Sequence, residues 1–189
     1  NPLNYKNNMS FNIIEQEIPE ILLIKPQVHG DIRGFFMESF NSRDLKKHGV
    51  NKEFVQDNHS RSGINVVRGL HFQQNNPQGK LVRVTRGVVF DVAVDVRSDS
   101  PTYGKHVGNI LSEENFHQMY IPPGFAHGFC TLSEIVDFQY KVTDYWDSSD
   151  ETGILWSDKD LNIDWPINIK DAIVSEKDKN FNPLFGENS

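Results

Sequence analysis

A run of short strand-like segments between residues 54 and 145 constrains the fold more than any other feature of the chain. Each is rich in apolar or aromatic residues, and glycine, proline, asparagine or serine separates it from the next. Many short strands with such turns are typical of β-sandwiches and β-barrels. The segments are 54–58, 65–72, 80–85, 88–96, 106–111, 116–121, 127–132 and 136–145. Before them we predict strands over 13–25 and 35–40 and one short helix between Asn41 and Gly49. We therefore expect an all-β barrel with a few short peripheral helices.

Length and composition are those of one folded domain. The 189 residues suffice for one large core and are few for two, so we predict a single domain over 11–189. Residues 1–10 are polar and unpatterned, and we expect an extension that is disordered or derived from cloning. The net charge of −7 without a basic cluster opposes binding to nucleic acid. The chain shows no signal-peptide pattern and no apolar stretch of membrane-spanning length, and it has a single cysteine, which together predict a cytoplasmic protein without membrane contact.

The segment 66–73 carries charges that a core strand would not need. It contains Arg68 and His71, and Lys80 follows after a polar turn. Buried cations are costly unless an anionic group meets them. We interpret this segment as the wall of a pocket for a polar or anionic small molecule. Strict alternation would send Arg68 and His71 to opposite faces, and a bulge at Gly69 would bring them together.

The alternation of apolar and polar residues is clearest in the segment 88–96. Phe90, Val92, Val94 and Val96 fall on one face, and Asp91 and Asp95 fall on the other. The pattern predicts a half-buried strand whose polar face meets solvent, a partner or a pocket.

A second motif follows at 122–128, where PPGFAHG fits the pattern P-x-G-x-x-H of cupins, which are double-sheet β-barrels. Such a turn before His127 is only moderately specific, and a satisfied surface histidine is the ordinary interpretation. A metal-binding cupin also needs two histidines one residue apart and a carboxylate, because divalent metals require three or four converging ligands. Here Phe72 and Gln73 follow His71, so the second histidine is absent. We expect no metal site.

Two residues are candidates for moving protons. His71 is a candidate general base, because imidazole side chains as a class can gain and lose a proton near neutral pH, although a histidine on an apolar strand is more often structural. Tyr140 shares a strand face with Val136, Phe138 and Val142, so it is expected to point into the barrel. A tyrosine there is ordinarily a core residue. If Tyr140 lies across the pocket from His71, it becomes a candidate proton donor.

Together these residues resemble the dTDP-4-dehydrorhamnose 3,5-epimerase family, a branch of the cupins. The similarity runs from about residue 13 to residue 178, and so many motifs in order make it highly specific. The matching segments are GDIRGFF at 30–36, FVQDNHS at 54–60, RGLHFQ at 68–73, GKLVR at 79–83, FDVAVD at 90–95, PGFAHGF at 123–129, YKVT at 140–143, IDWP at 163–166 and SEKD at 175–178. The resemblance implies a double-stranded β-helix, the jelly-roll barrel of the cupins.

The resemblance implies a substrate and a reaction. The substrate is a 4-keto-6-deoxyhexose linked to thymidine diphosphate, and its C4 carbonyl acidifies the hydrogens on C3 and C5. A base removes one of them, and an acid returns a proton to the opposite face. The family's base corresponds to His71, the carboxylate that holds the base to Asp178, and the proton donor to Tyr140. No redox or metal cofactor is implied.

The resemblance also assigns residues to substrate binding. Arg68 and Lys80 match positions that contact the sugar or the diphosphate, and His127 matches a further substrate contact. Positions that line the nucleotide or sugar site are Arg33, Glu38, Gln56, Asp57, Asn58, Glu151 and Lys177. One residue departs from the family pattern: where relatives carry a tyrosine that stacks on thymine, this chain has Trp146, whose larger face allows the same stacking.

Subunits of this family form a homodimer with exchanged N-terminal strands, so Arg33 and Glu38 are expected to serve the neighbouring subunit's pocket. We expect conversion of dTDP-4-dehydro-6-deoxy-D-glucose to dTDP-4-dehydro-L-rhamnose, with inversion at C3 and C5. The nearest alternative inverts only C3 or only C5 of a related nucleotide-linked 4-keto sugar. More distant alternatives are a non-catalytic cupin that binds sugar nucleotides and a metal-dependent cupin oxygenase or isomerase.

Overall fold

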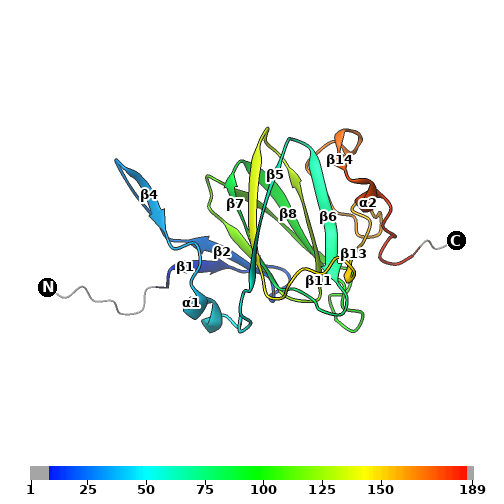
Figure 1. The fold of residues 1–189 in the computed structure, drawn as a ribbon, viewed down its shortest axis with the longest axis horizontal. Coiled ribbons are helices and arrows are strands. Elements are labelled where there is room, and N and C mark those ends of the chain that lie inside the picture. Colours follow the sequence, from blue (N-terminus) through cyan, green and yellow to red (C-terminus); the bar gives the residue numbers. More distant parts are fainter. Residues whose placement is uncertain (1–8, 187–189) are drawn as a thin grey trace.

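A computed structural model describes residues 9–186 as a barrel of two packed β-sheets (Figure 1). The strands are β1 (Phe11–Ile14), β2 (Leu22–Pro26), β3 (Val28–Asp31), β4 (Gly34–Met37), β5 (Gln56–Ser62), β6 (Val66–Gln73), β7 (Lys80–Arg86), β8 (Val88–Asp95), β9 (His106–Ser112), β10 (Gln118–Ile121), β11 (Phe125–Thr131), β12 (Val136–Val142), β13 (Glu151–Gly153) and β14 (Ile173–Val174). The helices are α1 (Ser42–Lys47), α2 (Glu176–Lys179) and a 3₁₀ turn, η1 (Ile169–Asp171). Residues 1–8 of the predicted extension lie outside the described residues. Ser10 donates two hydrogen bonds to Asp44 Oδ2, from its backbone nitrogen at 2.8 Å and its hydroxyl at 2.9 Å.

The two sheets interleave strands that are distant in sequence. The first sheet has the order β1-β2-β10-β7-β12-β5, and the second has the order β13-β6-β11-β8-β9, with β14 added in parallel beside β6. All other pairings in the two sheets are antiparallel. This arrangement confirms the predicted all-β barrel with short peripheral helices.

The main hydrophobic core lies between the sheets. It joins Val82 and Phe138 of the first sheet to Ala93 and Phe129 of the second, all at most 5% exposed. The outer face of the second sheet is covered by the C-terminal segment, whose Trp156 packs against strands β6, β8 and β11. A third cluster fixes α1 against the outer face of the first sheet. Apolar side chains therefore fill the space between the sheets and cover part of the outer face of each sheet. Polar residues that point inward are exceptions.

Several sequence predictions need correction. The predicted strand over 13–25 is two strands, β1 and β2, which pair with each other and are separated by a loop at 15–21. Strand β8 is not half-buried, because Asp91 and Asp95 are both fully inaccessible, as are Val92 and Val94 on the other face. Strands β13 and β14 lie in segments that showed no strand pattern. They are too short for alternation to be read and depend on pairing with β6.

The hairpin formed by β3 and β4 projects from the barrel, on the side opposite to β6, β14 and α2 (Figure 1). Its apolar side chains face solvent in the single chain: Ile32 is fully exposed, and Phe35 and Phe36 are 61% and 68% exposed. These three side chains form an exposed apolar surface at the tip of the hairpin.

No helix within residues 9–186 has the length and apolar character required to cross a membrane.

Candidate active site

A bulge in β6 determines which side chains of this strand enter the barrel. On β11, His127 pairs with His71 and Phe129 pairs with Arg68, so two steps along β11 match three along β6. The bulge suggested for Gly69 is therefore present. Gly69 has φ +122°, and a Cβ there would lie 2.5 Å from Gly128 Cα, so only glycine fits. Directly paired residues project to the same side of a sheet, and Phe129 is in the inter-sheet core. Both Arg68 and His71 consequently face the interior.

The first sheet supplies the opposite wall of the interior. Lys80 and Val82 are two positions apart on β7, so their side chains lie on the same face. Tyr140 of β12 pairs directly with Val82. Because Val82 belongs to the core between the sheets, Lys80 and Tyr140 both point inward. Asn58 of β5 pairs with Tyr140 and shares its side. The ring of Tyr140 lies 6.0 Å from that of Phe138 and packs on the core. Tyr140 is thus placed across the barrel from the strand that carries His71.

His71 forms a close pair with Asp178, although the two residues are 107 positions apart. The Nε2 atom of His71 lies 2.7 Å from Asp178 Oδ1, and the other carboxylate oxygen accepts a hydrogen bond from Gly69 N at 3.1 Å. Asp178 belongs to α2, whose cap Ser175 accepts a hydrogen bond from Asp178 N at 3.1 Å. The bulged strand and a capped helix turn therefore fix this carboxylate from two sides.

The charge state of Asp178 determines the tautomer of His71. Burial opposes ionisation of Asp178, but the hydrogen bonds from His71 and Gly69 outweigh it and hold the pKa of the carboxyl below its usual value. A carboxylate only accepts hydrogen bonds, so Nε2 of His71 carries the proton and Nδ1 has a free lone pair. The imidazole is 26% exposed. His71 can thus accept a proton at Nδ1, with a carboxylate behind it that stabilises the imidazolium.

The interior shifts the pKa values of Lys80 and Tyr140 in opposite directions. Burial lowers the pKa of the Lys80 ammonium to about 8, although the negative charge of Glu151 favours its cationic form. Burial and the charge of Glu151 raise the pKa of the Tyr140 phenol, and Arg68 partly offsets them. At neutral pH the interior therefore presents an ammonium and a neutral phenol, which are suitable for stabilising an oxyanion and donating a proton.

A second histidine and carboxylate pair lies deeper in the barrel. His127 Nε2 lies 2.8 Å from Asp91 Oδ2, and their side chains are 7% and 0% exposed. Burial raises the pKa of Asp91 and lowers that of His127, which favours a neutral pair that shares one proton. The other oxygen of Asp91, Oδ1, is buried without a hydrogen-bond partner in the described part of the chain.

A chain of polar contacts leads from the interior to the surface. Glu151 on β13 accepts a hydrogen bond from the indole nitrogen of Trp146 at 3.1 Å and forms an ion pair with Lys177 of α2. Gln56 accepts a hydrogen bond from Trp146 N at 3.1 Å and donates one to Asn58 at 2.8 Å. The Trp146 side chain is half-exposed beside this network. The arrangement forms a polar rim with one aromatic surface.

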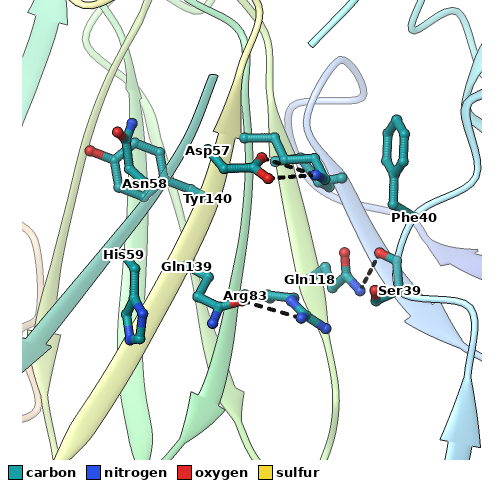
Figure 2. Close-up of a pocket in the computed structure, with 11 residues that line it drawn as sticks. Ser39, Phe40, Asp57, Asn58, His59, Arg83, Gln118, Gln139 and Tyr140 are labelled. Atoms are coloured by element: carbon teal, nitrogen blue, oxygen red, sulfur yellow. Dashed lines mark hydrogen bonds and ion pairs between the residues drawn. The ribbon is translucent and has the colours of Figure 1, made fainter. Parts of the chain in front are cut away.

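A groove runs along the first sheet on the side of Gln139 and Arg83. It encloses about 360 Å³ between β5, β12 and β7 and the segment at 39–40. Gln139 and Arg83 point into it, whereas Tyr140 and Asn58 extend to the opposite side of the strands (Figure 2). Asp57 lies in this groove and pairs with Lys141 at 2.9 Å. Asp57, predicted to line the nucleotide or sugar site, is thus not directed toward His71.

Comparison with known proteins identifies the family. The model of the dTDP-4-dehydrorhamnose 3,5-epimerase family matches residues 15–185. The chain belongs to this family. It is 56% identical to the dTDP-4-dehydrorhamnose 3,5-epimerase of Pseudomonas aeruginosa over 86% of this chain and 90% of that protein. The crystal structure of the Legionella pneumophila enzyme in complex with dTDP-4-keto-L-rhamnose is 50% identical, covers 93% of both chains and has a TM-score of 0.90. A 3'-monoepimerase from Streptomyces bikiniensis, crystallised with dTDP, is 26% identical over 90% of this chain and 86% of its own, with a TM-score of 0.83.

The family match confirms the predicted resemblance, the cupin-type barrel and the assignment to the isomerases. Within this 3,5-epimerase barrel the structure brings most of the predicted site residues together. The inward group and the rim comprise His71, Asp178, Tyr140, Arg68, Lys80, His127, Asn58, Gln56, Trp146, Glu151 and Lys177. Arg33 and Glu38 lie apart: Arg33 is on the projecting hairpin and pairs with Asp31, and Glu38 accepts a hydrogen bond from Asn41 at 2.9 Å. Within one chain these two do not join the epimerase site.

Asp91 is an inward-facing residue that the sequence interpretation did not assign to the epimerase site. The sequence pattern that could have indicated Asp91 is its place on the polar face of the segment 88–96, because that face was allowed to meet a pocket. What the sequence could not show is that His127 pairs with it, since the two lie 36 positions apart on neighbouring strands. Among residues 9–186, no three histidine, cysteine, aspartate or glutamate side chains converge as metal ligands would.

Proposed function

We propose that this dTDP-4-dehydrorhamnose 3,5-epimerase uses His71 as its base, Asp178 as the carboxylate that orients it, and Tyr140 as its proton donor. One observation supports the assignment. His71 forms a hydrogen bond to Asp178 through Nε2, and strand β6, which carries His71, faces strand β12, which carries Tyr140, across the barrel. A hexose placed between them has a base on one face and an acid on the other. Inversion at carbon requires that arrangement.

The proton transfers balance without a redox cofactor. The lone pair on Nδ1 of His71 takes the hydrogen from C3 or C5, and the electrons of the broken C–H bond move through the C3–C4 or C4–C5 bond onto the C4 oxygen. Lys80 and Arg68 supply positive charge to that enolate, as their inward placement supports. Tyr140 then gives its phenolic proton to the opposite face of the same carbon, as the electron pair returns from the C4 oxygen, reforms the ketone and supplies the new C–H bond. The imidazolium and the phenolate exchange protons with solvent before the second carbon reacts.

The rim is suited to the nucleotide. We propose that thymine stacks on Trp146, which is half-exposed and held by Glu151 through its indole nitrogen. Lys177 of α2 supplies a cation on the same side for the diphosphate, and Gln56 adds a polar contact. The bound dTDP-4-keto-L-rhamnose of the Legionella pneumophila relative supports a nucleotide-linked sugar as the ligand of this barrel.

We also propose a homodimer in which the N-terminal strands are exchanged, so that Arg33 and Glu38 complete the neighbouring site. The high exposure of Ile32, Phe35 and Phe36 supports this, because a neighbouring subunit would cover apolar surface that one chain leaves in solvent. Co-expression of Arg33→Ala and His71→Asn chains tests it. In an exchanged dimer, one site of the mixed dimer has both His71 and the neighbour's Arg33, so activity returns. A mixture as inactive as its parents would contradict the exchange.

Solvent exchange in deuterated buffer tests the reaction itself. Incubation with dTDP-4-keto-6-deoxyglucose is expected to place deuterium at both C3 and C5, detected by NMR or mass spectrometry. Exchange at C3 or C5 alone would favour the single-centre epimerase, a class found in this fold in Streptomyces bikiniensis. His71→Asn separates enzyme from binding protein: we expect turnover to fall about a thousandfold while dTDP affinity is kept. Exchange at neither carbon by the native chain would refute the proposed function.

A further inference from the structure

Phe181 contacts the imidazole of His71 from the side of the C-terminal segment. The two ring centroids are 5.9 Å apart and their planes are inclined at 73°, an edge-to-face arrangement. Phe181 also lies against Gly153, the residue that pairs with His71 on β13. A Cβ on Gly153 would lie 2.5 Å from Phe181 Cε2, so the ring occupies the space that a side chain there would fill.

The position of Phe181 is set by contacts that do not involve His71. Asn182 O accepts a hydrogen bond from Leu155 N at 2.9 Å, and Leu184 N donates one to the buried carboxylate of Asp158 at 2.8 Å. Leu184 also packs on the cluster around Trp156. The ring of Phe181 is therefore held by its own segment and forms a fixed wall beside the imidazole.

Asp178 contacts the imidazole of His71 at one ring nitrogen, Nε2. A contact at a single nitrogen fixes the tautomer, but it does little to resist rotation of the ring plane about the side-chain torsions. The imidazole is also 26% exposed, so the barrel encloses it only in part. A rigid aromatic wall limits this rotation and keeps Nδ1 directed at one point in the interior.

The geometry points to Phe181 as a positioning residue that holds the imidazole of His71 in the orientation required for proton abstraction. This inference rests on the proposed role of His71 as the base. Phe181 does not touch the reacting atoms, and it acts through the histidine. Its effect is therefore expected in kcat rather than in nucleotide affinity.

Phe181→Ala tests the inference, with Phe185→Ala as the matched control. Phe185 is on the same segment but packs on Tyr103 rather than on His71, with ring centroids 5.6 Å apart. We expect F181A to lower kcat about fivefold, which is the rate change that corresponds to the typical stabilisation by an edge-to-face aromatic pair. The dTDP affinity should be unchanged. F185A should keep the native kcat, and Phe181→Tyr should restore most of the loss. If F181A fails to fold, Phe181→Leu replaces it with the same expected direction.

A spectroscopic readout separates positioning from general packing. In protein labelled with ¹⁵N-histidine, native His71 should show one Nε2–H tautomer, and F181A should show broadened or averaged imidazole signals. Native kcat in F181A, an equal loss in F185A, or lowered kcat with an unchanged His71 spectrum would each overturn the inference. His71→Asn is assayed beside them: if it keeps native activity, the proposed base is wrong, whereas an inactive H71N beside a native F181A refutes only the role of Phe181.

Discussion

The barrel contains two histidine and aspartate pairs with the same contact and different surroundings. The nitrogen to oxygen distances are 2.7 Å for His71 and Asp178 and 2.8 Å for His127 and Asp91. The imidazole is 26% exposed in the first pair and 7% exposed in the second. Contact geometry alone therefore does not distinguish a base from a structural pair.

The surroundings of the carboxylates make the difference. Asp178 receives a backbone hydrogen bond from Gly69 in addition to that from His71, and its pKa is lowered despite burial. Asp91 has no partner for its second oxygen in the described part of the chain, and burial raises its pKa. A carboxylate that stays ionised can stabilise an imidazolium, whereas a neutral pair has no charge to offer. We expect the first pair to move protons and the second to remain static.

Replacing the carboxylate of the first pair should have the largest effect. Asp178→Asn keeps the shape but removes the negative charge and permits the other tautomer of His71, so we expect kcat to fall about a thousandfold. Steady-state kinetics and calorimetric titration with dTDP measure the change. The affinity for dTDP should stay near native, and a D178N variant with native kcat would remove the distinction between the pairs.

Removing the phenol of Tyr140 should cost somewhat less. Tyr140→Phe keeps the ring against Phe138 and deletes the proton donor, so we expect formation of the epimerised product to fall about a hundredfold. Deuterium from solvent should still enter C3 or C5 with retained configuration, because His71 remains. Loss of exchange and of inversion to the same extent would argue against separate acid and base residues.

The pH dependence should report Lys80. Burial places its pKa at about 8, and the cationic form exists below that value, so the enolate loses its ammonium as pH rises through it. We expect kcat/KM to decline above about pH 8, approaching tenfold per pH unit. In Lys80→Arg the guanidinium remains charged, and this alkaline decline should disappear from the profile even if the plateau is lower. An unchanged alkaline limb in K80R would assign it to another group.

The smallest effect is expected from the second pair. Asp91→Asn replaces a neutral carboxyl by an amide that can donate the same hydrogen bond to His127, so the free energy of unfolding should change by about 1 kcal/mol or less. We expect kcat to remain within about threefold of native, on the same argument. Chemical denaturation and kinetics provide the two measurements. A destabilisation of about 3 kcal/mol or more would instead indicate a buried ion pair.

Alternation and turn residues were sufficient to predict the barrel, most of its strands and the inward direction of Tyr140. They did not predict the direction of Arg68, because the bulge at Gly69 depends on how closely β11 approaches: a Cβ at this glycine would lie 2.5 Å from Gly128 Cα. Asp178 could be assigned only through the family resemblance, since its partner is 107 positions away. The pairing of His127 with Asp91 requires the register of two strands, which no local pattern contains.

The most direct test compares the two histidines in one exchange experiment. His71→Asn and His127→Asn are incubated separately with dTDP-4-keto-6-deoxyglucose in deuterated buffer, and deuterium at C3 and C5 is followed over time. We predict that H127N exchanges both hydrogens, at reduced affinity, and that H71N exchanges neither. Two results would contradict the distinction between the two pairs: exchange at either carbon by H71N, or loss of exchange at one carbon only in H127N. Either result would show that the second pair also acts as a base.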